Sequence, residues 1–353
     1  MKRFFVLLCV FILLFAISRT SVSAVDREEI YKESGAAELE GDREKGLTDS
    51  LWSTLTTALT GGAGKAIKHG AMIVACLLLV AVLKGVSAIR EESLSSSFDF
   101  VSAAVLGAAS FPAVYGVFVY AKEAVESMHV FCLSLLPVTT TLYAMGGNTA
   151  QGLSAGAGMS LFLTVTETVN SRLLMPMLST GFAFALTGLL PAAESIAPVG
   201  TFIKNCATTL ITFVFSLVGF VFYFQTVITA AADGLAYRTV RFASGAFIPL
   251  IGNAVGDSAR TVFGAVSTVK ASVGALGLSV VMGYLLPPLV CILLYKASFS
   301  FCALFASLCG LEKQSKFIKE LGALLGAALA LLVACITVFI VISAVFLKSG
   351  VSA

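Results

Sequence analysis

The stretch FIPLIGNAVGDSARTVFGAVSTVK, residues Phe247–Lys270, is the longest semi-polar interval in the strongly apolar part of the chain. Its apolar residues recur at three- and four-residue steps, which is typical of an amphipathic helix. It is too polar to face lipid across a bilayer and too apolar for an ordinary soluble loop. We therefore expect an interfacial or re-entrant helix pair, with a glycine-softened break near residues 252–256. The plainer alternative is an amphipathic connector lying on the membrane.

The composition of the whole chain is that of a membrane protein. Of its 353 residues, 58% are hydrophobic and 12% are charged, with a mean hydropathy of +0.97. Soluble domains are usually about a quarter charged. The eight cysteines form no CxxC pair, and neither histidine has a cysteine at metal-ligand spacing. We therefore predict buried, unpaired cysteines, no metal, no cofactor and no nucleic-acid partner.

The N-terminus has the pattern of a secretory signal peptide. Lys2 and Arg3 precede an apolar core, and the small residues Val22-Ser23-Ala24 follow it. We predict cleavage after residue 24, with an uncleaved anchor as the alternative. Residues 25–66 would then form a charged and amphipathic extracytoplasmic segment, and residues 67–353 a multi-span membrane domain.

The apolar runs predict an all-α, polytopic integral membrane helical bundle with broken, re-entrant or interfacial helices. A span needs about 20 apolar residues. Five predicted crossings precede the basic cluster Lys313, Lys316 and Lys319, which the positive-inside rule places in the cytoplasm. These crossings cover residues 71–89, 98–121, 173–190, 206–232 and 273–295. Between these crossings, residues 128–145 and 152–169 would form the broken or re-entrant pair. A different assignment of residues 152–190 would move the loop 233–271 to the cytoplasmic side.

A weak internal repeat that relates residues 98–190 to residues 206–302 is one hypothesis. A shift of 112 residues places Pro137 on Pro249 and Pro176 on Pro288. Internal duplication is common in membrane transport folds. If it is real, the opening stretch and residues 136–158 are equivalent elements.

One motif could carry catalysis. Gly152-Leu153-Ser154-Ala155-Gly156 matches the G-x-S-x-G pattern of serine hydrolases, and His129 is a candidate base. The same small residues also permit close packing of helices, which fits this helical, apolar context better. We predict packing, and no enzymatic activity.

Ionisable groups at membrane depth face a cavity, a partner or each other. Glu167 is the best candidate for such an internal group, with Arg172 as its expected partner. In the opening stretch, Asp257 and Arg260 are candidates for contact with a partner protein or a pore. The set of candidate partner-binding or pore-lining residues is Pro249, Gly252, Asp257, Arg260, Glu167 and Arg172.

Several segments of the chain resemble the stage III sporulation protein AE family. They are Phe247-Ile248-Pro249, Gly252, Asp257, Thr261-Val262 and Lys270-Ala271-Ser272-Val273-Gly274. The layout is also similar to that family, and the likeness covers most of residues 50–350. The short charged N-terminal region departs from the family, which puts a partner contact there in doubt.

The resemblance implies a role in endospore formation. It suggests a membrane component of a channel or secretion-like assembly in the mother-cell membrane around the forespore, with other stage III sporulation membrane proteins as partners and no catalytic residues. From the residues alone, two alternatives stay open: a stand-alone secondary transporter, and an intramembrane hydrolase that uses Ser154 and His129.

Overall fold

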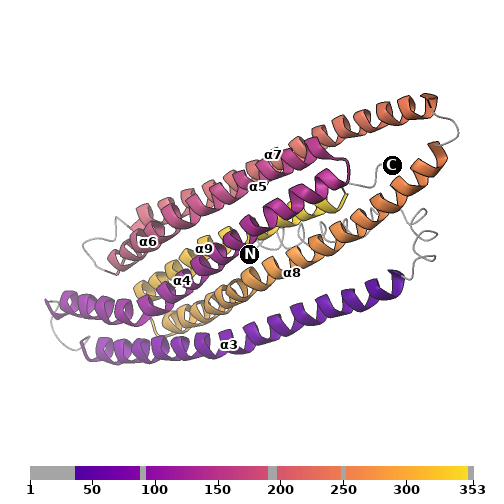
Figure 1. Ribbon diagram of the computed structural model, residues 1–353. Coiled ribbons are helices and arrows are strands. Elements are labelled where there is room, and N and C mark those ends of the chain that lie inside the picture. Colours follow the sequence, from indigo (N-terminus) through magenta and orange to yellow (C-terminus); the bar gives the residue numbers. More distant parts are fainter. Residues whose placement is uncertain (1–35, 88–92, 190–196, 248–251, 349–353) are drawn as a thin grey trace.

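The computed structural model describes the backbone of residues 36–87, 93–189, 197–247 and 252–348. It describes side chains for most of 52–85, 99–189, 199–225 and 265–347. Almost all of these residues are helical (Figure 1). The helices are α3 (Ala36–Ser87), α4 (Ser93–Met145), α5 (Thr149–Val169), the π-helix η1 (Asn170–Leu174), α6 (Met175–Thr187), α7 (Ala197–Phe247), α8 (Gly252–Leu308) and α9 (Glu312–Lys348). The all-α prediction is confirmed, whereas the predicted signal peptide lies outside the described residues.

The helices run up and down along one elongated bundle (Figure 1). α5, η1 and α6 follow one another without a break and form a single rod. Tight turns with left-handed glycines, Gly147 at φ 77° and Gly310 at φ 71°, join α4 to α5 and α8 to α9. At the α8–α9 end, Lys84 of α3 donates a hydrogen bond to the carbonyl of Gly310 at 3.0 Å, and Lys313 lies 3.3 Å from Asp99.

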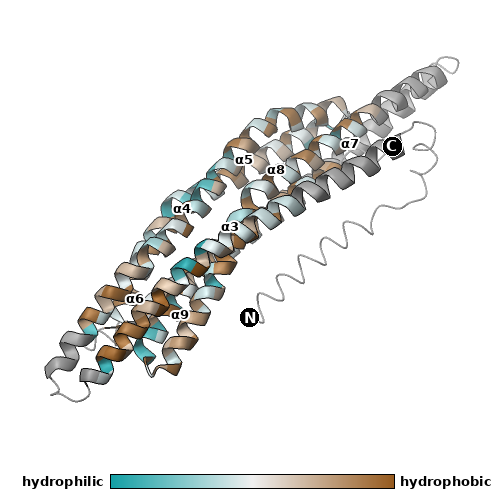
Figure 2. Ribbon diagram, turned by 90° about the horizontal axis from the view of Figure 1, so that it is seen from below, coloured by the Kyte–Doolittle hydropathy of each residue, from teal (hydrophilic) through white to brown (hydrophobic). Residues whose placement is uncertain are grey.

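Five described helices are long and apolar enough to cross a membrane. The candidate spans are Trp52–Gly85, Asp99–Met145, Val199–Gln225, Ala265–Leu308 and Glu312–Leu347. They fit a multi-pass membrane protein. The α4 helix has 53 residues, about 80 Å at 1.5 Å per residue, and therefore exceeds a hydrocarbon core of about 30 Å. Figure 2 shows hydrophobic residues along these helices, with hydrophilic residues partway along α4.

The core is organised around α9. This helix packs against α8, α7 and α4. Six of its buried side chains recur at alternating four- and three-residue steps, which keeps one seam of the helix against its neighbours. They are Leu321, Leu325, Ala328, Leu332, Cys335 and Phe339.

Small residues set the contact between α3 and α8. Gly62, Ala66 and Gly70 lie four residues apart on α3 and face α8. The hydroxyl of Ser298 donates to the carbonyl of Ala66 at 3.1 Å, and the Cys302 thiol lies 3.5 Å from the carbonyl of Gly70. Small side chains let the two backbones approach closely enough for such contacts.

The structure corrects two predicted breaks. No helix break occurs at residues 252–256, because α8 begins at Gly252 and continues through the end of the opening stretch. The predicted crossing 98–121 and the predicted broken or re-entrant segment 128–145 are one helix, α4, with Pro137 inside it. A proline inside a helix costs about 3 kcal/mol, and burial of neighbours such as Cys132 and Leu142 offsets that cost.

The segments 128–145 and 152–169 therefore continue into longer helices and do not form a separate short pair. The five predicted crossings fall in five successive rods, which are α3, α4, the α5–η1–α6 rod, α7 and α8. Because successive rods reverse direction, the basic cluster at the start of α9 lies at the opposite end of the bundle from the start of α3 (Figure 1). Its cytoplasmic side stays a prediction, as do the internal repeat and the boundary at residue 66.

Candidate functional site

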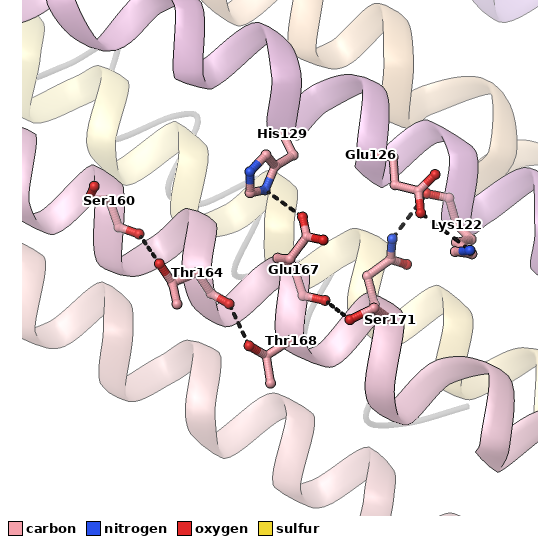
Figure 3. Close-up of polar contacts among 9 residues, drawn as sticks. Lys122, Glu126, His129, Ser160, Thr164, Glu167, Thr168 and Ser171 are labelled. Atoms are coloured by element: carbon pink, nitrogen blue, oxygen red, sulfur yellow. Dashed lines mark hydrogen bonds and ion pairs between the residues drawn. The ribbon is translucent and has the colours of Figure 1, made fainter.

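A group of polar residues lies halfway along the bundle, where α4 packs against α5 and η1. Figure 3 shows these side chains. We call Lys122, Glu126 and His129 of α4, with Glu167 and Asn170 of the neighbouring rod, the mid-bundle cluster. Ionisable groups at this depth in a membrane helix are costly unless they meet water, a partner or each other.

Three contacts connect the cluster. Lys122 pairs with Glu126 at 3.4 Å, one turn along α4. Between the helices, the Glu167 carboxylate lies 3.3 Å from Nδ1 of His129. The amide nitrogen of Asn170 donates to the backbone carbonyl of Lys122 at 3.2 Å. The cluster therefore fastens the middle of α4 to the middle of the α5–η1–α6 rod.

Exposure divides the cluster into an inner and an outer side. Asn170 is only 2% exposed, and its carbonyl oxygen has no hydrogen-bond partner. The Glu167 side chain is 56% exposed and that of His129 is 17% exposed. Nδ1 of His129 is close to Glu167, but its geometry is not that of a hydrogen bond. The carboxylate of Glu167 is thus only weakly engaged by the protein and is open on its outer side.

The π-helical turn belongs to the same place. Asn170–Leu174 forms η1, and Pro176 follows at the start of α6. Pro176 has no N–H to donate to the carbonyl four residues earlier, that of Arg172, so the regular ladder is interrupted there. Single π-turns inside helices occur frequently at functional sites. Here the turn carries Asn170 on the buried side and Arg172 on the exposed side.

The predicted partner of Glu167 is wrong. Arg172 is exposed and makes no ion pair with Glu167, and His129 occupies that position instead. Glu167 and Arg172 are five positions apart across the π-turn, whereas side chains of one α-helix meet at three- or four-residue spacing. A histidine on α4 reaches the carboxylate from the neighbouring helix.

The proposed Ser–His pair is not assembled. Ser154 is 7% exposed, and its hydroxyl oxygen has no hydrogen-bond partner. His129, the expected base, faces Glu167. The glycines next to Ser154 serve packing: a Cβ on Gly152 would meet the Tyr143 side chain at 2.7 Å, and one on Gly156 would meet a methyl of Thr140 at 3.1 Å.

The four candidates of the opening stretch lie in or next to the first turns of α8. Pro249 lies outside the described residues. Gly252 is the first residue of α8, and Asp257 and Arg260 lie on that helix. The described side chains do not include theirs, so their predicted contacts with a partner or pore stay predictions.

Sequence analysis missed the environment of Lys270. This lysine is 3% exposed, and its Nζ lies 4.4 Å from the ring centroid of Tyr143 and 5.7 Å from that of Phe346. The two rings provide a cation–π environment that favours the buried ammonium. The helical spacing could have predicted that Lys270 faces the packed side of α8. It lies four residues from both Val266 and Gly274, which are on that side.

Among the residues that the structure describes, no group of three or more His, Cys, Asp and Glu side chains could hold a metal ion. The seven described cysteines are all free thiols. The mid-bundle cluster itself offers charged and hydrogen-bonding groups.

Comparison with known proteins gives a consistent result. The sequence model of a family described as stage III sporulation protein AE matches residues 34–350. A stage III sporulation protein AE from Bacillus subtilis (strain 168) is 23% identical over 163 residues, which are 46% of this chain and 41% of that relative. The matched part thus spans less than half of the length of that relative. No solved structure matches the chain.

Proposed function

Because the chain belongs to the stage III sporulation protein AE family, we propose that it is a non-enzymatic membrane component of a channel or secretion-like assembly. This assembly would connect the mother cell with the forespore and would be needed for late forespore development. The family places the chain in sporulation, and its five apolar helices fit a multi-pass membrane protein.

One structural observation favours a conducting or partner-binding role over a purely architectural one. Glu167 is charged, lies midway along the bundle and is 56% exposed on the outer surface. A membrane helix whose outer side met only lipid would carry apolar side chains there. Glu167 and Arg172 therefore stay candidates for a pore or a partner surface.

We further propose that the chain resides in the mother-cell membrane around the forespore. Its partners would be other stage III sporulation membrane proteins. The exposed charged residues of the α4–α5 surface, including Glu123 and Glu126, offer a polar surface on which such proteins could be recognised.

The test is to delete this chain from sporulating cells and then to restore it as a tagged copy. A strain without this chain should form few heat-resistant spores, and a tagged full-length copy should restore them and co-purify with other sporulation membrane proteins. A deletion strain with normal spore counts would contradict the proposal. A second tagged multi-pass protein of the same membrane is the control for non-specific co-purification.

A stand-alone secondary transporter is the second candidate. Helices that depart from regular geometry beside charged groups at the bilayer midplane are typical of such transporters, and the π-turn η1 beside Glu167 is a mild departure of this kind in a continuous rod. The purified chain alone in liposomes would then accumulate a solute against its gradient. An assembly component would not do so and would require its partners.

A further inference from the structure

The outward side of the α5–η1–α6 rod is mostly polar from Ser160 to Thr180, where Leu161 and Pro176 are its exposed apolar residues. Its exposed residues include a run of hydroxyls and charges, which we call the polar face: Ser160, Thr164, Glu167, Thr168, Ser171, Arg172, Ser179 and Thr180. From Ser160 to Thr180 the rod rises about 30 Å, which matches the hydrocarbon core of a bilayer. α5 is also not one of the five helices apolar enough to be a candidate span.

The hydroxyls alone would not require water. Thr164 donates to the carbonyl of Ser160 at 2.9 Å, and Thr168 donates to that of Thr164 at 2.8 Å. Ser171 donates to the carbonyl of Glu167 at 2.7 Å (Figure 3). Because each donor is bonded within its own helix, these side chains can tolerate lipid.

Whether the polar face requires water depends on its two charged residues. Glu167 is largely open, and its contact with His129 is not a hydrogen bond. Arg172 is exposed and has no ion pair with Glu167, one turn and a half away. Charged side chains at membrane depth almost always face a water-filled cavity or a partner.

The neighbouring helix fixes the depth of the polar face. The rings of Phe162 on α5 and Phe215 on α7 lie 6.2 Å apart in an edge-on contact, and Gly158 packs on the ring of Phe222. At this same level, α7 exposes Phe213 and Leu217 on its outer side. Since α7 is a candidate span, the polar face lies at the level of lipid and not beyond it.

We infer that the polar face of α5, η1 and α6 lines a water-filled path through the membrane, with Glu167 on its wall. The path would take water and small hydrophilic solutes, and Glu167 would attract cations to it. The inference rests on the proposed function, because further protein must close the path on its open side. Asn170, buried behind Glu167 with a free carbonyl oxygen, holds this part of the wall against α4.

The experiment measures the reactivity of single cysteines in a full-length chain whose native cysteines are replaced. Ser160→Cys, Thr164→Cys and Ser171→Cys probe the polar face, and Leu210→Cys and Leu217→Cys are the matched controls on α7. The reagents are a positively and a negatively charged methanethiosulfonate, neither of which crosses membranes. Thiols react as thiolates, which form in water and not in lipid, so the polar-face positions should react about tenfold faster or more.

Labelling is carried out in sporulating cells and in a host that makes no other sporulation protein. Fast reaction of the polar face in both hosts means that copies of this chain close the path. Fast reaction only in sporulating cells means that other components close it. Reaction as slow as at Leu217 in both hosts would overturn the inference, whereas normal spores from a deletion strain would overturn only the proposed function.

Glu167→Gln sharpens the test at Thr164→Cys, because these positions are three residues apart on one face. Removal of a unit charge about 6 Å away should lower the rate of the cationic reagent and raise that of the anionic one, each by about threefold. Glu320→Gln, on α9, is the control and should leave the ratio of the cationic to the anionic reaction rate unchanged. A ratio that Glu167→Gln does not alter would contradict the position of Glu167 on the path.

Discussion

Two helices that pack against each other, α5 and α7, differ in their outer surfaces. The outer side of α7 carries large apolar groups such as Phe213, Leu217 and Phe220 among the exposed hydroxyls of Thr209, Thr212 and Ser216, and none of its described side chains is charged. The polar face of α5, η1 and α6, at the same depth, carries hydroxyls and two charges. Both helices bury similar aromatic residues between them. Burial alone therefore does not define the role of a helix in this bundle. The side that the protein leaves open indicates whether lipid, water or another protein surrounds the helix.

The largest expected effect comes from a charge on the outer side of α7. Leu217→Asp would place a carboxylate in lipid at a cost of about 3 kcal/mol. We expect little of this variant in membranes by immunoblot. Ser160→Asp is the control at matched depth on the polar face, and we expect an effect under about 1 kcal/mol there. Equal loss of the two proteins would remove the distinction between the surfaces.

The next effect concerns the seam that both helices share. A Cβ on Gly158 would overlap the ring of Phe222, so Gly158→Val should overpack the α5–α7 contact by roughly 1–3 kcal/mol. The melting temperature of the purified protein in detergent measures it. Gly116→Ala, where nothing lies within 4 Å, is the control and should not lower stability. A variant at Gly158 as stable as the wild type would mean that α5 and α7 are not held in this register.

A smaller effect separates the inner and outer sides of the π-turn. Asn170→Ala removes the interhelical hydrogen bond to the carbonyl of Lys122 and should cost about 1 kcal/mol. Ser171→Ala removes only a bond within its own helix, so we expect a change within about 0.5 kcal/mol. The two melting temperatures in detergent give the comparison. If Ser171→Ala were the more damaging change, the outer side would hold a structural contact.

The smallest effect is expected at Ser154. Its buried hydroxyl has no hydrogen-bond partner, so Ser154→Ala should change stability by less than about 0.5 kcal/mol and leave spore counts normal. Immunoblots beside counts of heat-resistant spores measure both. Loss of spores at an unchanged protein level would revive the hydrolase hypothesis.

Much of the fold could be predicted from apolar length alone. The predicted crossings 206–232 and 273–295 lie within α7 and α8, and the crossing 71–89 lies in α3 as far as Ser87, where the described part of that helix ends. About 20 apolar residues are enough to specify a helix across lipid. The breaks were not predictable in the same way. Pro137 favours interruption locally, whereas α4 continues through it. Gly252 and Gly256 also favour interruption, but they lie in the first turns of α8 and the helix continues from them.

The candidate site could be predicted only in part. Glu167 is identifiable as an ionisable residue in an apolar run. Its neighbour His129 lies 38 positions away in the sequence, on another helix, and no periodicity connects the two. The burial of Lys270 between Tyr143 and Phe346 depends on three helices meeting, so the sequence around Lys270 alone could not reveal it.

The most direct test asks what each outer surface touches. A photo-activatable amino acid is placed at Thr164 or, separately, at Phe213, and sporulating cells are irradiated before the adducts are identified by mass spectrometry. The account predicts phospholipid adducts at Phe213 and none at Thr164, since only the α7 surface meets acyl chains. Phospholipid adducts at Thr164 in the same yield as at Phe213 would contradict it.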